Sequence, residues 1–310
     1  MKLNNPAYIG LTSSICGPME AKTEHAKNID IKMEESMFDE DCWELAEEQM
    51  IKACLGHFLK NNQTDLIIAG DLINQNTPTT NAVSNFPVPF LGTFSACASF
   101  VESLIVGSKL IDNYPSILCG ASSHFYTAEK QFRTPIEYGA QRKLTTQVTV
   151  TGSGFVELTA QNTDIKISDV FIGNVINSGI TDANNMGDAM APAAEATIRQ
   201  ALDSGCVYDF IITGDLGKQG STTLNKLIKL ENHIDTGAVF FDNTDYDVHQ
   251  GASGPACITL YFISEVLPKL KSGEYKKILL VGTGCLISQV TAIKKEEMRA
   301  IAHAVAIERV

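Results

Sequence analysis

The hydrophobic pattern of the chain alternates between short apolar runs and amphipathic segments. The segments at 65–75 and 209–219 each open with an apolar run that ends in Gly-Asp, which is typical of a buried parallel strand that leads into a loop. Before each of them, apolar residues recur with helical spacing, over 43–59 and 192–202. Strands that alternate with helices predict an α/β protein whose mostly parallel sheets are covered by helices.

The two strand segments are copies of one another. Residues 65–75 read DLIIAGDLINQ and residues 209–219 read DFIITGDLGKQ, so seven of eleven positions are identical. After each copy the pattern predicts a helix and a strand, and an alternating strand then closes each half. The predicted elements are a helix at 97–111 with the strand SILCGASS, and a helix at 255–270 with the strand KILLVGTG.

The repeat predicts how the chain is organised, as two βαβαβ-type halves, 1–163 and 164–310. We expect the halves to pack about a pseudo-twofold axis into one αβαβα body of five layers, with a shared central helical layer. The alternative is two independent α/β domains on a linker. Residues 160–165 contain no Pro, Gly or Ser, so the sequence favours one fused body.

Composition narrows the function classes. The 310 residues are 44% apolar and 19% charged, with a formal net charge of -12. This suffices for a sizeable core, and the acidic balance argues against general binding to nucleic acid. No window reaches the ~20 apolar residues that span a bilayer, and the N-terminus has no apolar signal core, so we expect a cytosolic chain. The eight cysteines form no Cys-x-x-Cys pair, which argues against a zinc site.

The topology predicts where a ligand would sit. In open α/β sheets, ligands collect beyond the carboxyl ends of the strands. The segments that follow predicted strands should therefore lie near one another, namely 70–76, 94–98, 120–124, 214–220 and 251–254.

Cys97 is the cysteine placed where chemistry is expected. An apolar strand runs into Ser95, a natural N-cap, which puts Cys97 in the first turn of the next helix. Ser99 with Glu102 offers a rival capping box that would shift the start. A thiol at a helix start ionises more readily, and the same amides suit a carboxylate or phosphate. The alternative is a core cysteine.

Several motifs resemble a known superfamily. Ala-Cys-Ala-Ser at 96–99, followed by a long apolar helix, resembles the nucleophile region of thiolases and ketoacyl synthases, and GASG at 251–254 resembles their second glycine-rich loop. More specifically, the chain is similar to the stage V sporulation protein AD family over five runs: AGDLINQN, SSHFYTAEKQFRTPIEYGAQ, TGSG, GITDANNMGDAMAPAA and ITGDL.

The resemblance implies a thiolase-like fold that binds dipicolinic acid, pyridine-2,6-dicarboxylate, for uptake into the developing spore. It also implies membrane proteins of the stage V sporulation A group as partners, and a peripheral place on the cytoplasmic side of the spore inner membrane. Thiolase-like bodies commonly form homodimers, so a dimer is expected.

The chain departs from the catalytic pattern that the resemblance brings with it. Thiolases carry a histidine three residues before the first glycine of that loop, and here the position is Val248, with His249 displaced by one. They also carry a Cys-x-Gly near the end of the chain, and the matching stretch has no cysteine until Cys285. A nucleophilic thiol needs a base and an acid. His124 is a candidate substitute, and a loop histidine is the alternative.

These departures favour a binding pocket without catalysis. A small aromatic dianion needs positive charge or amide donors and a flat slot. The candidate donors are the amides at Cys97, the backbone from Gly251 through Gly254, which includes Ser253, and Arg133, whose planar fork suits a carboxylate. A surface ion pair with Glu129 is the alternative for Arg133.

The remaining candidate ligand residues complete the predicted rim. Phe132 and Tyr138 are candidates to stack on the ligand ring, with core packing as the alternative. Asp71, Gln75 and Asn76 are expected to close the rim, although the repeat also allows Asp71 to be a turn residue.

Calcium is expected only as part of the ligand. No cofactor is predicted, but a calcium chelate of dipicolinate would leave metal positions open for Asp71, Glu129 or Glu137. The competing hypothesis is an acyl-thioester condensing enzyme or thiolase that uses Cys97 with His124, and a third is a structural membrane partner with a vestigial pocket.

Overall fold

The computed structural model describes residues 2–132, 142–242 and 244–310. The first half contains β1 (Lys2–Cys16), β2 (Ile31–Lys32), α1 (Trp43–Leu59), β3 (Leu66–Gly70), α2 (Thr77–Val83), β4 (Phe90–Gly92), α3 (Ser99–Leu110), β5 (Ser116–Ser123), α4 (Phe125–Phe132), β6 (Val148–Thr149) and β7 (Gly152–Thr159).

The second half repeats this course. It contains β8 (Ile165–Phe171), β9 (Ile176–Asn177), α5 (Met186–Leu202), β10 (Phe210–Thr213), α6 (Gly217–Leu227), β11 (His233–Asp235), α7 (Thr236–Val239), β12 (Ala252–Ser253), α8 (Pro255–Tyr261), α9 (Leu267–Ser272), β13 (Lys277–Leu286), α10 (Gln289–Lys294) and β14 (Arg299–Arg309). A π-helical stretch, Phe262–Val266, joins α8 to α9.

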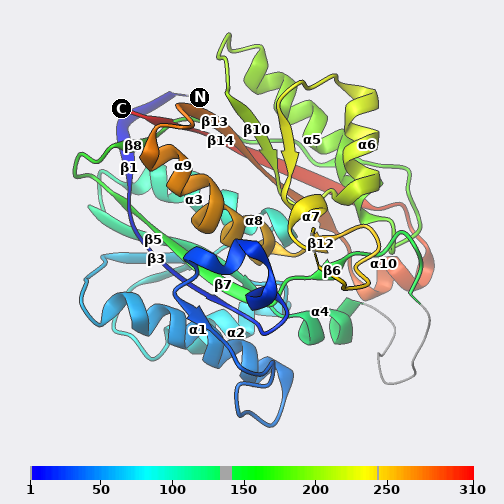
Figure 1. Cartoon of the computed structure of the whole chain (residues 1–310), viewed down its shortest axis with the longest axis horizontal. Helices are drawn as coiled ribbons and strands as arrows, with labels where there is room; N and C mark the ends of the chain where they lie inside the picture. Colours follow the sequence, from blue (N-terminus) through cyan, green and yellow to red (C-terminus); the bar gives the residue numbers. More distant parts are fainter. Residues whose placement is uncertain (1, 133–141, 243) are drawn as a thin grey trace.

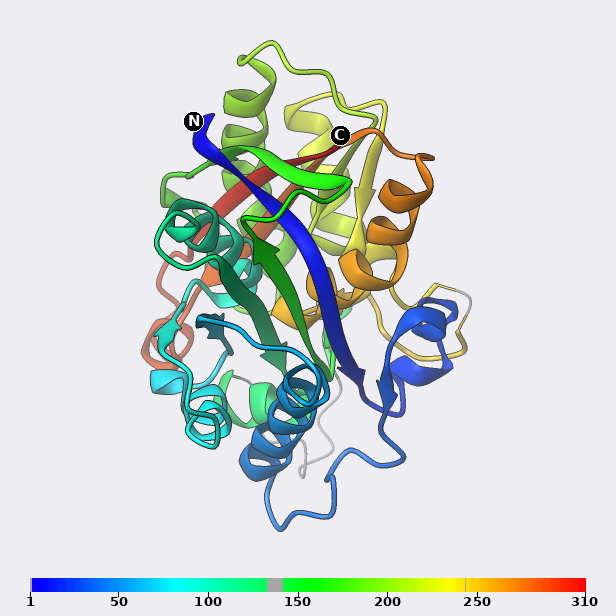
Figure 2. The same ribbon diagram turned by 90° about the vertical axis from the view of Figure 1, so that its left-hand side faces the viewer.

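The strands of the two halves follow the same order. From the outer edge inward, the first half runs β4-β3-β5-β7-β1 and the second half runs β11-β10-β13-β14-β8. Antiparallel pairing of β1 with β8 joins the two sets, with Ala7 opposite Ile167 and Tyr8 opposite Lys166. Figure 2 shows β1 running beside β7 and β8 where the two sets meet.

Helices and half-sheets form the five expected layers (Figure 1). Outside the first half-sheet, Met50 and Leu55 of α1 pack on Ile67 and Leu118. Between the half-sheets, α3 and the α8–α9 segment share one core, in which Phe100 faces Phe262. Outside the second half-sheet, the small apolar side chains of α5 pack on β13 and β14. The αβαβα prediction is therefore confirmed.

Two predicted elements have the predicted bounds, and several others differ from them. The alternating strand predicted to close the first half is observed as two strands, β6 and β7, which belong to different sheets. The helix at 43–59 and the strand SILCGASS are observed as α1 and β5. The helix predicted from 192 begins earlier, at Met186, and carries Pro192 inside it. The helix predicted to start at Cys97 begins at Ser99, because a separate 3-10 turn, Ala96–Ala98, precedes it.

No helix in the described part of the chain combines the length and apolarity that crossing a membrane requires.

A buried carboxyl group lies at the end of β1. Glu20 is 3% exposed, and its Oε1 accepts the Thr151 amide at 2.9 Å, whereas Oε2 has no hydrogen-bond partner among the described residues. Burial raises the pKa of Glu20 to about 7. Glu20 therefore holds a proton in the folded protein over a pH range in which an unfolded glutamate has lost it.

This group makes stability depend on pH in a predictable direction. Because the folded pKa is raised, its contribution to stability is full below the unfolded value of 4.5 and is lost as the pH rises toward about 7. We predict that the unfolding free energy of Glu20→Gln rises relative to that of the wild type by about 1.4 kcal/mol per pH unit across that window. Urea unfolding at pH 5, 6 and 7.5 measures it, with exposed Glu24→Gln as control. A difference between Glu20→Gln and wild type that does not change with pH would contradict the prediction.

Candidate functional site

A cavity of about 560 Å³ lies between the halves at the carboxyl ends of the strands. Its walls come from the loop after β3, the turn after β4, helix α4, strands β6 and β12, the start of α5, and the end of β13 with α10. The described lining is uncharged and mostly apolar: Leu72, Asn74, Phe94, Ala96, Cys97, Ala128, Gln131, Phe132, Thr149, Ala183, Met186, Ser253, Cys285, Leu286, Ile287, Ser288, Gln289, Val290 and Thr291. The topological prediction of the ligand position thus has a matching cavity.

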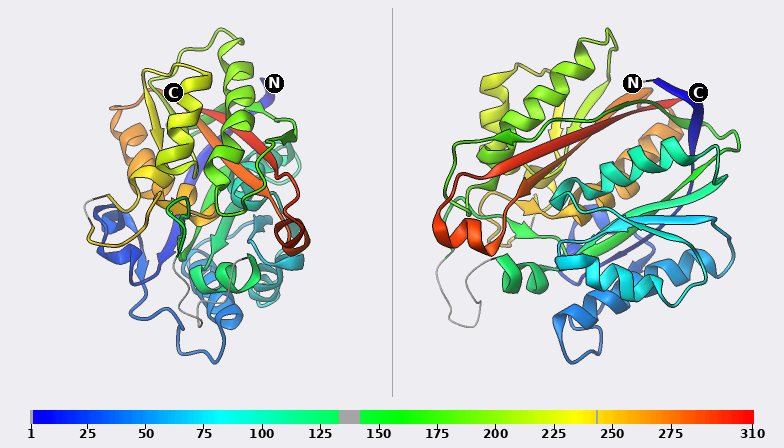
Figure 3. Two further views of the ribbon diagram at one scale, coloured as in Figure 1. Left: turned by 90° about the vertical axis from the view of Figure 1, so that its right-hand side faces the viewer. Right: turned by 180° about the vertical axis from the view of Figure 1, so that it is seen from behind.

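Helices α4 and α10 form one side of this cavity. The two helices come from different halves and lie side by side, as Figure 3 shows. The Gln289 side chain donates to the Gln131 carbonyl at 2.7 Å, and the Gln131 side chain donates to the Leu72 carbonyl at 2.8 Å. This chain of amide contacts ties the rim together across the halves.

Cys97 sits in a strained turn at the cavity wall. Ala96 has a φ of 51°, a left-handed conformation that is unfavourable for a residue with a Cβ. The Ser99 hydroxyl holds the turn, since it accepts the Ser95 amide at 3.0 Å and donates to the Ala96 carbonyl at 2.7 Å. The predicted N-cap is wrong, because the Ser95 side chain makes no cap and Cys97 precedes the helix.

Strand β13 approaches this turn closely because it has glycines there. A Cβ on Gly284 would lie 2.4 Å from the Ser95 carbonyl oxygen, and a Cβ on Gly282 would lie 2.8 Å from the Val101 side chain. Thr283 lies between them, and its hydroxyl donates to Asp215 Oδ1 at 2.8 Å. The Gly-Thr-Gly stretch, where thiolases are expected to carry a cysteine, thus serves packing and holds Asp215.

Asp215 is a buried acid that is held by Thr283, next to the glycines that contact the Cys97 turn. It is 1% exposed, and its Oδ2 accepts the Gly254 amide at 3.1 Å. Burial raises the pKa of the Asp215 carboxyl to about 6. Sequence reasoning missed this residue, because the repeat marks Asp71 and Asp215 alike as turn residues.

The expected activation of Cys97 is wrong. Burial first, and then the charge of the Asp215 carboxyl, raise the pKa of the Cys97 thiol well above its ordinary value. The Gly254 amide opposes this shift without overcoming it. The sulfur therefore reaches the cavity as a neutral thiol, and the helix-start effect expected from the sequence does not govern it.

His124 lies apart from the cavity lining. The ring is 1% exposed, its Nε2 donates to the Ser36 carbonyl at 2.8 Å, and its Nδ1 accepts the Tyr126 amide at 3.3 Å. Burial lowers the pKa of the ring, so it is a neutral, fully bonded histidine. The structure does not bring it to the cavity as a substitute base, and the loop-histidine alternative describes its position.

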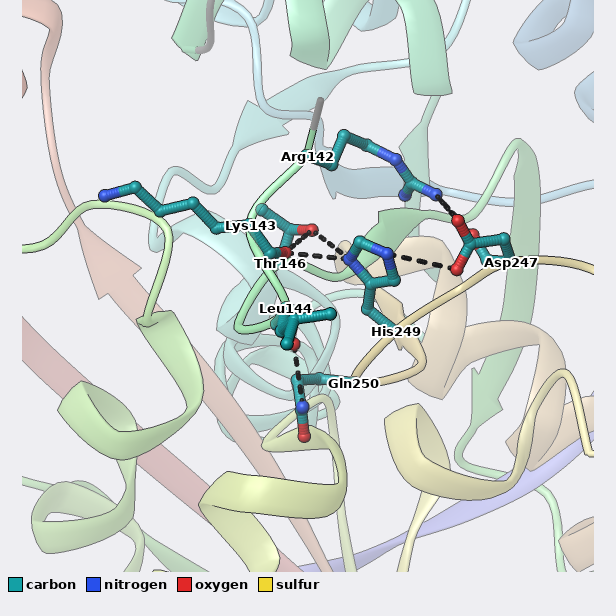
Figure 4. Close-up of polar contacts among 7 residues, drawn as sticks. All are labelled: Arg142, Lys143, Leu144, Thr146, Asp247, His249 and Gln250. Carbon is teal, nitrogen blue, oxygen red and sulfur yellow. Dashed lines mark hydrogen bonds and ion pairs between the residues drawn. The ribbon is translucent and has the colours of Figure 1, made fainter. Parts of the chain in front are cut away.

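His249 also turns away, as the displaced motif predicts. Its Nδ1 lies 2.8 Å from the Lys143 carbonyl, and its Nε2 lies 3.1 Å from Asp247 (Figure 4). Val248, which takes the expected histidine position, is 7% exposed and packs in an apolar cluster. Neither residue lines the cavity.

The residues predicted to close the rim are structural turn residues. Asp71 accepts the Ile73 and Thr79 amides and the Thr79 hydroxyl, which occupies its carboxyl group. Asn76 accepts the Asp71 amide and donates to a backbone carbonyl, and Gln75 is exposed. None of Asp71, Gln75 and Asn76 lines the cavity, so the turn alternative for Asp71 is the observed one.

The glycine-rich loop contributes one of its two predicted residues. Ser253 on β12 lines the cavity, where β12 pairs with β6 and sets Ser253 opposite Thr149. Gly251 is not in the lining, and its carbonyl accepts the Val148 amide at 2.8 Å. The predicted residues Arg133, Glu137 and Tyr138 lie outside the described residues.

The described lining contains no Lys, Arg, Asp or Glu side chain. Nor does any group of three or more His, Cys, Asp and Glu residues within 2–132, 142–242 and 244–310 have the arrangement of a metal site.

The fold and the cysteine-bearing cavity define a thiolase-like protein. Solved structures with this fold include OleA from Xanthomonas campestris, with a TM-score of 0.59, 14% identity and coverage of 98% of this chain and 99% of that one. Germicidin synthase from Streptomyces coelicolor, a type III polyketide synthase, has a TM-score of 0.59, 11% identity and coverage of 99% and 100%. 3-Oxoacyl-(acyl carrier protein) synthase III from Pseudomonas aeruginosa has a TM-score of 0.54 and 11% identity, and the match covers 98% of this chain and 98% of that one.

Within that class, the chain belongs to the stage V sporulation protein AD family. The family model matches residues 1–308. Stage V sporulation protein AD of Bacillus subtilis strain 168 is 36% identical in an alignment 322 residues long, gaps included. The alignment covers 98% of this chain and 95% of that protein. The chain is thus a sporulation protein with a thiolase-like fold.

Gly254 is the backbone position on which the site depends most directly. Its φ of 95° and ψ of 154° suit glycine alone, and a Cβ would lie 2.6 Å from Ser123 Oγ. We predict that Gly254→Ala costs about 3 kcal/mol of unfolding free energy, from backbone strain and overpacking. Gly205→Ala is the matched control, since Gly205 also has a positive φ but open space around it. It should cost about 1 kcal/mol. Equal losses in urea unfolding would contradict the prediction.

Proposed function

We propose that this chain is a non-catalytic, thiolase-like protein that binds dipicolinic acid, alone or as its calcium chelate, for uptake into the developing spore. One observation carries the proposal, namely the cavity of about 560 Å³ that reaches Cys97 with no histidine in its described lining. A cavity of this size suits a small organic ligand. Without an imidazole to accept and return protons, the same cavity has poor means for acyl transfer.

The lining chemistry supports a flat aromatic ligand. Phe94, Phe132 and Met186 supply apolar surface for a ring, while Thr149 and Ser253 contribute hydroxyl-bearing side chains to the lining. The described lining supplies no cationic side chain for the two carboxylates. The proposal therefore assigns that charge to Arg133, which follows Phe132 directly in the sequence.

The cellular setting is part of the same proposal. Membership in a sporulation family supports a role in the spore, with membrane proteins of the stage V sporulation A group as partners. We expect the protein to act at the cytoplasmic side of the spore inner membrane, as a homodimer.

Calorimetry tests the ligand. We predict heat release and a thermal shift on titration with dipicolinate, and a loss of at least tenfold in affinity for Arg133→Ala, because a charge-assisted pair contributes about 1.5–3 kcal/mol. Arg142→Ala is the matched control, since Arg142 pairs with Asp247 away from the lining. This variant should bind dipicolinate with the wild-type affinity. Titration with the calcium chelate, and with benzene-1,3-dicarboxylate, which lacks the ring nitrogen, shows whether the metal is part of the ligand.

A wild-type protein that shows neither heat nor a thermal shift at millimolar dipicolinate would overturn the ligand proposal. Equal loss of affinity in Arg133→Ala and Arg142→Ala would overturn the assignment of the charge.

The second candidate is an acyl-thioester condensing enzyme, which the position of Cys97 in the cavity wall favours. Mass spectrometry after incubation with acyl-CoA of several chain lengths decides between the two. We predict no acyl adduct on the wild type, because its thiol is neutral and lacks a base. An adduct on the wild type that is missing from Cys97→Ala would establish the enzyme instead.

A further inference from the structure

Two hydroxyl-bearing side chains lie next to each other in the wall of the cavity. Thr149 of β6 is directly opposite Ser253 of β12 in a parallel pair of strands, and both residues line the cavity. Neighbouring strands lie about 4.8 Å apart, and a hydroxyl donates over about 2.7 Å. One small acceptor group placed between the two hydroxyls can therefore bind both of them.

Neither hydroxyl is used by the fold. Thr149 is 3% exposed and Ser253 is 2% exposed, yet neither side-chain oxygen forms a hydrogen bond with any residue that the structure describes. Buried polar groups in proteins are normally hydrogen-bonded, so an exception calls for an explanation. Because both side chains line the cavity, their partner has to be a molecule bound inside it.

The other polar side chains of the described lining are engaged in the wall itself or are exposed. Ser288 and Thr291 bond to each other at the start of α10, with 3.0 Å between their hydroxyl oxygens. The side chains of Gln131 and Gln289 each donate to a backbone carbonyl of the rim, and Asn74 is exposed. The hydroxyls on β6 and β12 are thus the buried ones that this lining leaves for a ligand.

The backbone around the two hydroxyls is fixed before a ligand arrives. The Val150 amide donates to the Ser253 carbonyl at 2.9 Å, and the Gln147 side chain donates to the Ala252 carbonyl at 2.7 Å. These bonds hold β12 against the segment that carries Thr149. Donors that are held in place in advance lose little conformational freedom when a ligand binds, so more of their interaction energy appears as affinity.

We propose that the Thr149 and Ser253 hydroxyls together bind one carboxylate of the ligand and thereby make the cavity selective for dicarboxylates. Hydrogen bonds from hydroxyls to a carboxylate are charge-assisted and about twice as strong as those between neutral groups. The pair supplies donors without charge, so it complements Arg133, which meets the charge of the other carboxylate. The inference rests on the proposed function and adds the contact that distinguishes a dianion from a monoanion.

A comparison of two acids tests this selectivity. Calorimetry on the full chain measures the affinity for dipicolinate and for pyridine-2-carboxylate, which lacks the second carboxylate. Thr149→Val and Ser253→Ala each remove one hydroxyl with little change in shape. We expect each variant to bind dipicolinate about tenfold more weakly, because it loses a hydrogen bond to a charged group, and to bind pyridine-2-carboxylate as the wild type does. Thr149→Ser keeps a hydroxyl and should restore the affinity for dipicolinate.

Thr259→Val and Ser103→Ala are the matched controls. Both hydroxyls are buried outside the cavity lining and donate to backbone carbonyls of their own helices. These controls should lower the melting temperature and leave both affinities unchanged. Thr149→Val and Ser253→Ala should instead melt at the wild-type temperature without ligand, because they break no hydrogen bond within the described part of the protein.

The outcomes separate this inference from the proposed function. If the wild type binds dipicolinate and the variants at 149 and 253 keep its preference over pyridine-2-carboxylate, the inference alone is overturned. Equal losses for the two acids, or a lower melting temperature of the ligand-free variants, would assign the hydroxyls to the fold and overturn it too. A wild type that binds neither acid would overturn both proposals.

Discussion

The close packing of β13 on the turn that bears Cys97 is the constraint on which the site depends. Gly282 and Gly284 allow the approach, since a Cβ at either position would meet the turn or the helix after it at under 3 Å. This contact joins a strand of the second half to the cysteine of the first half, and it sets Thr283 where it can hold Asp215. The glycines are therefore required by packing, and the chemistry of the cavity follows from the polar residue between them.

The same arrangement supports the proposal that this cavity binds a ligand without acyl transfer. A buried cysteine needs a partner that stabilises negative charge on sulfur, and both histidines near the relevant motifs are engaged elsewhere: His124 by the Ser36 carbonyl and His249 by Lys143 and Asp247. Burial first, and then the charge of Asp215, instead raise the pKa of the Cys97 thiol. The cavity retains shape and apolar surface, which are the properties that binding needs.

The repeat and its periodicity were sufficient to predict the layers and the meeting of both halves at one cavity, because strand order and layer packing follow from hydrophobic pattern. The site residues were predicted less well, because they depend on contacts between segments far apart in sequence. Cys97 and Ser253 line the cavity as expected, but the side chains of Asp71 and Asn76 form hydrogen bonds within their own turn and do not line it. No local pattern distinguishes Asp71 from Asp215, since only the tertiary partners Thr283 and Gly254 do so.

The joining of the two halves through β1 and β8 has a kinetic consequence. Many two-lobed proteins admit a ligand when the lobes rotate apart about a hinge. Here the lobes share a continuous hydrogen-bonded sheet and a common core of α3 with α8, so rotation would break both. A ligand would instead have to enter and leave through local movement of the cavity walls, which include α4 and α10. Contacts between those walls, such as the hydrogen bond of Gln289 to the Gln131 carbonyl, would then oppose that movement and lengthen the residence time of a bound molecule.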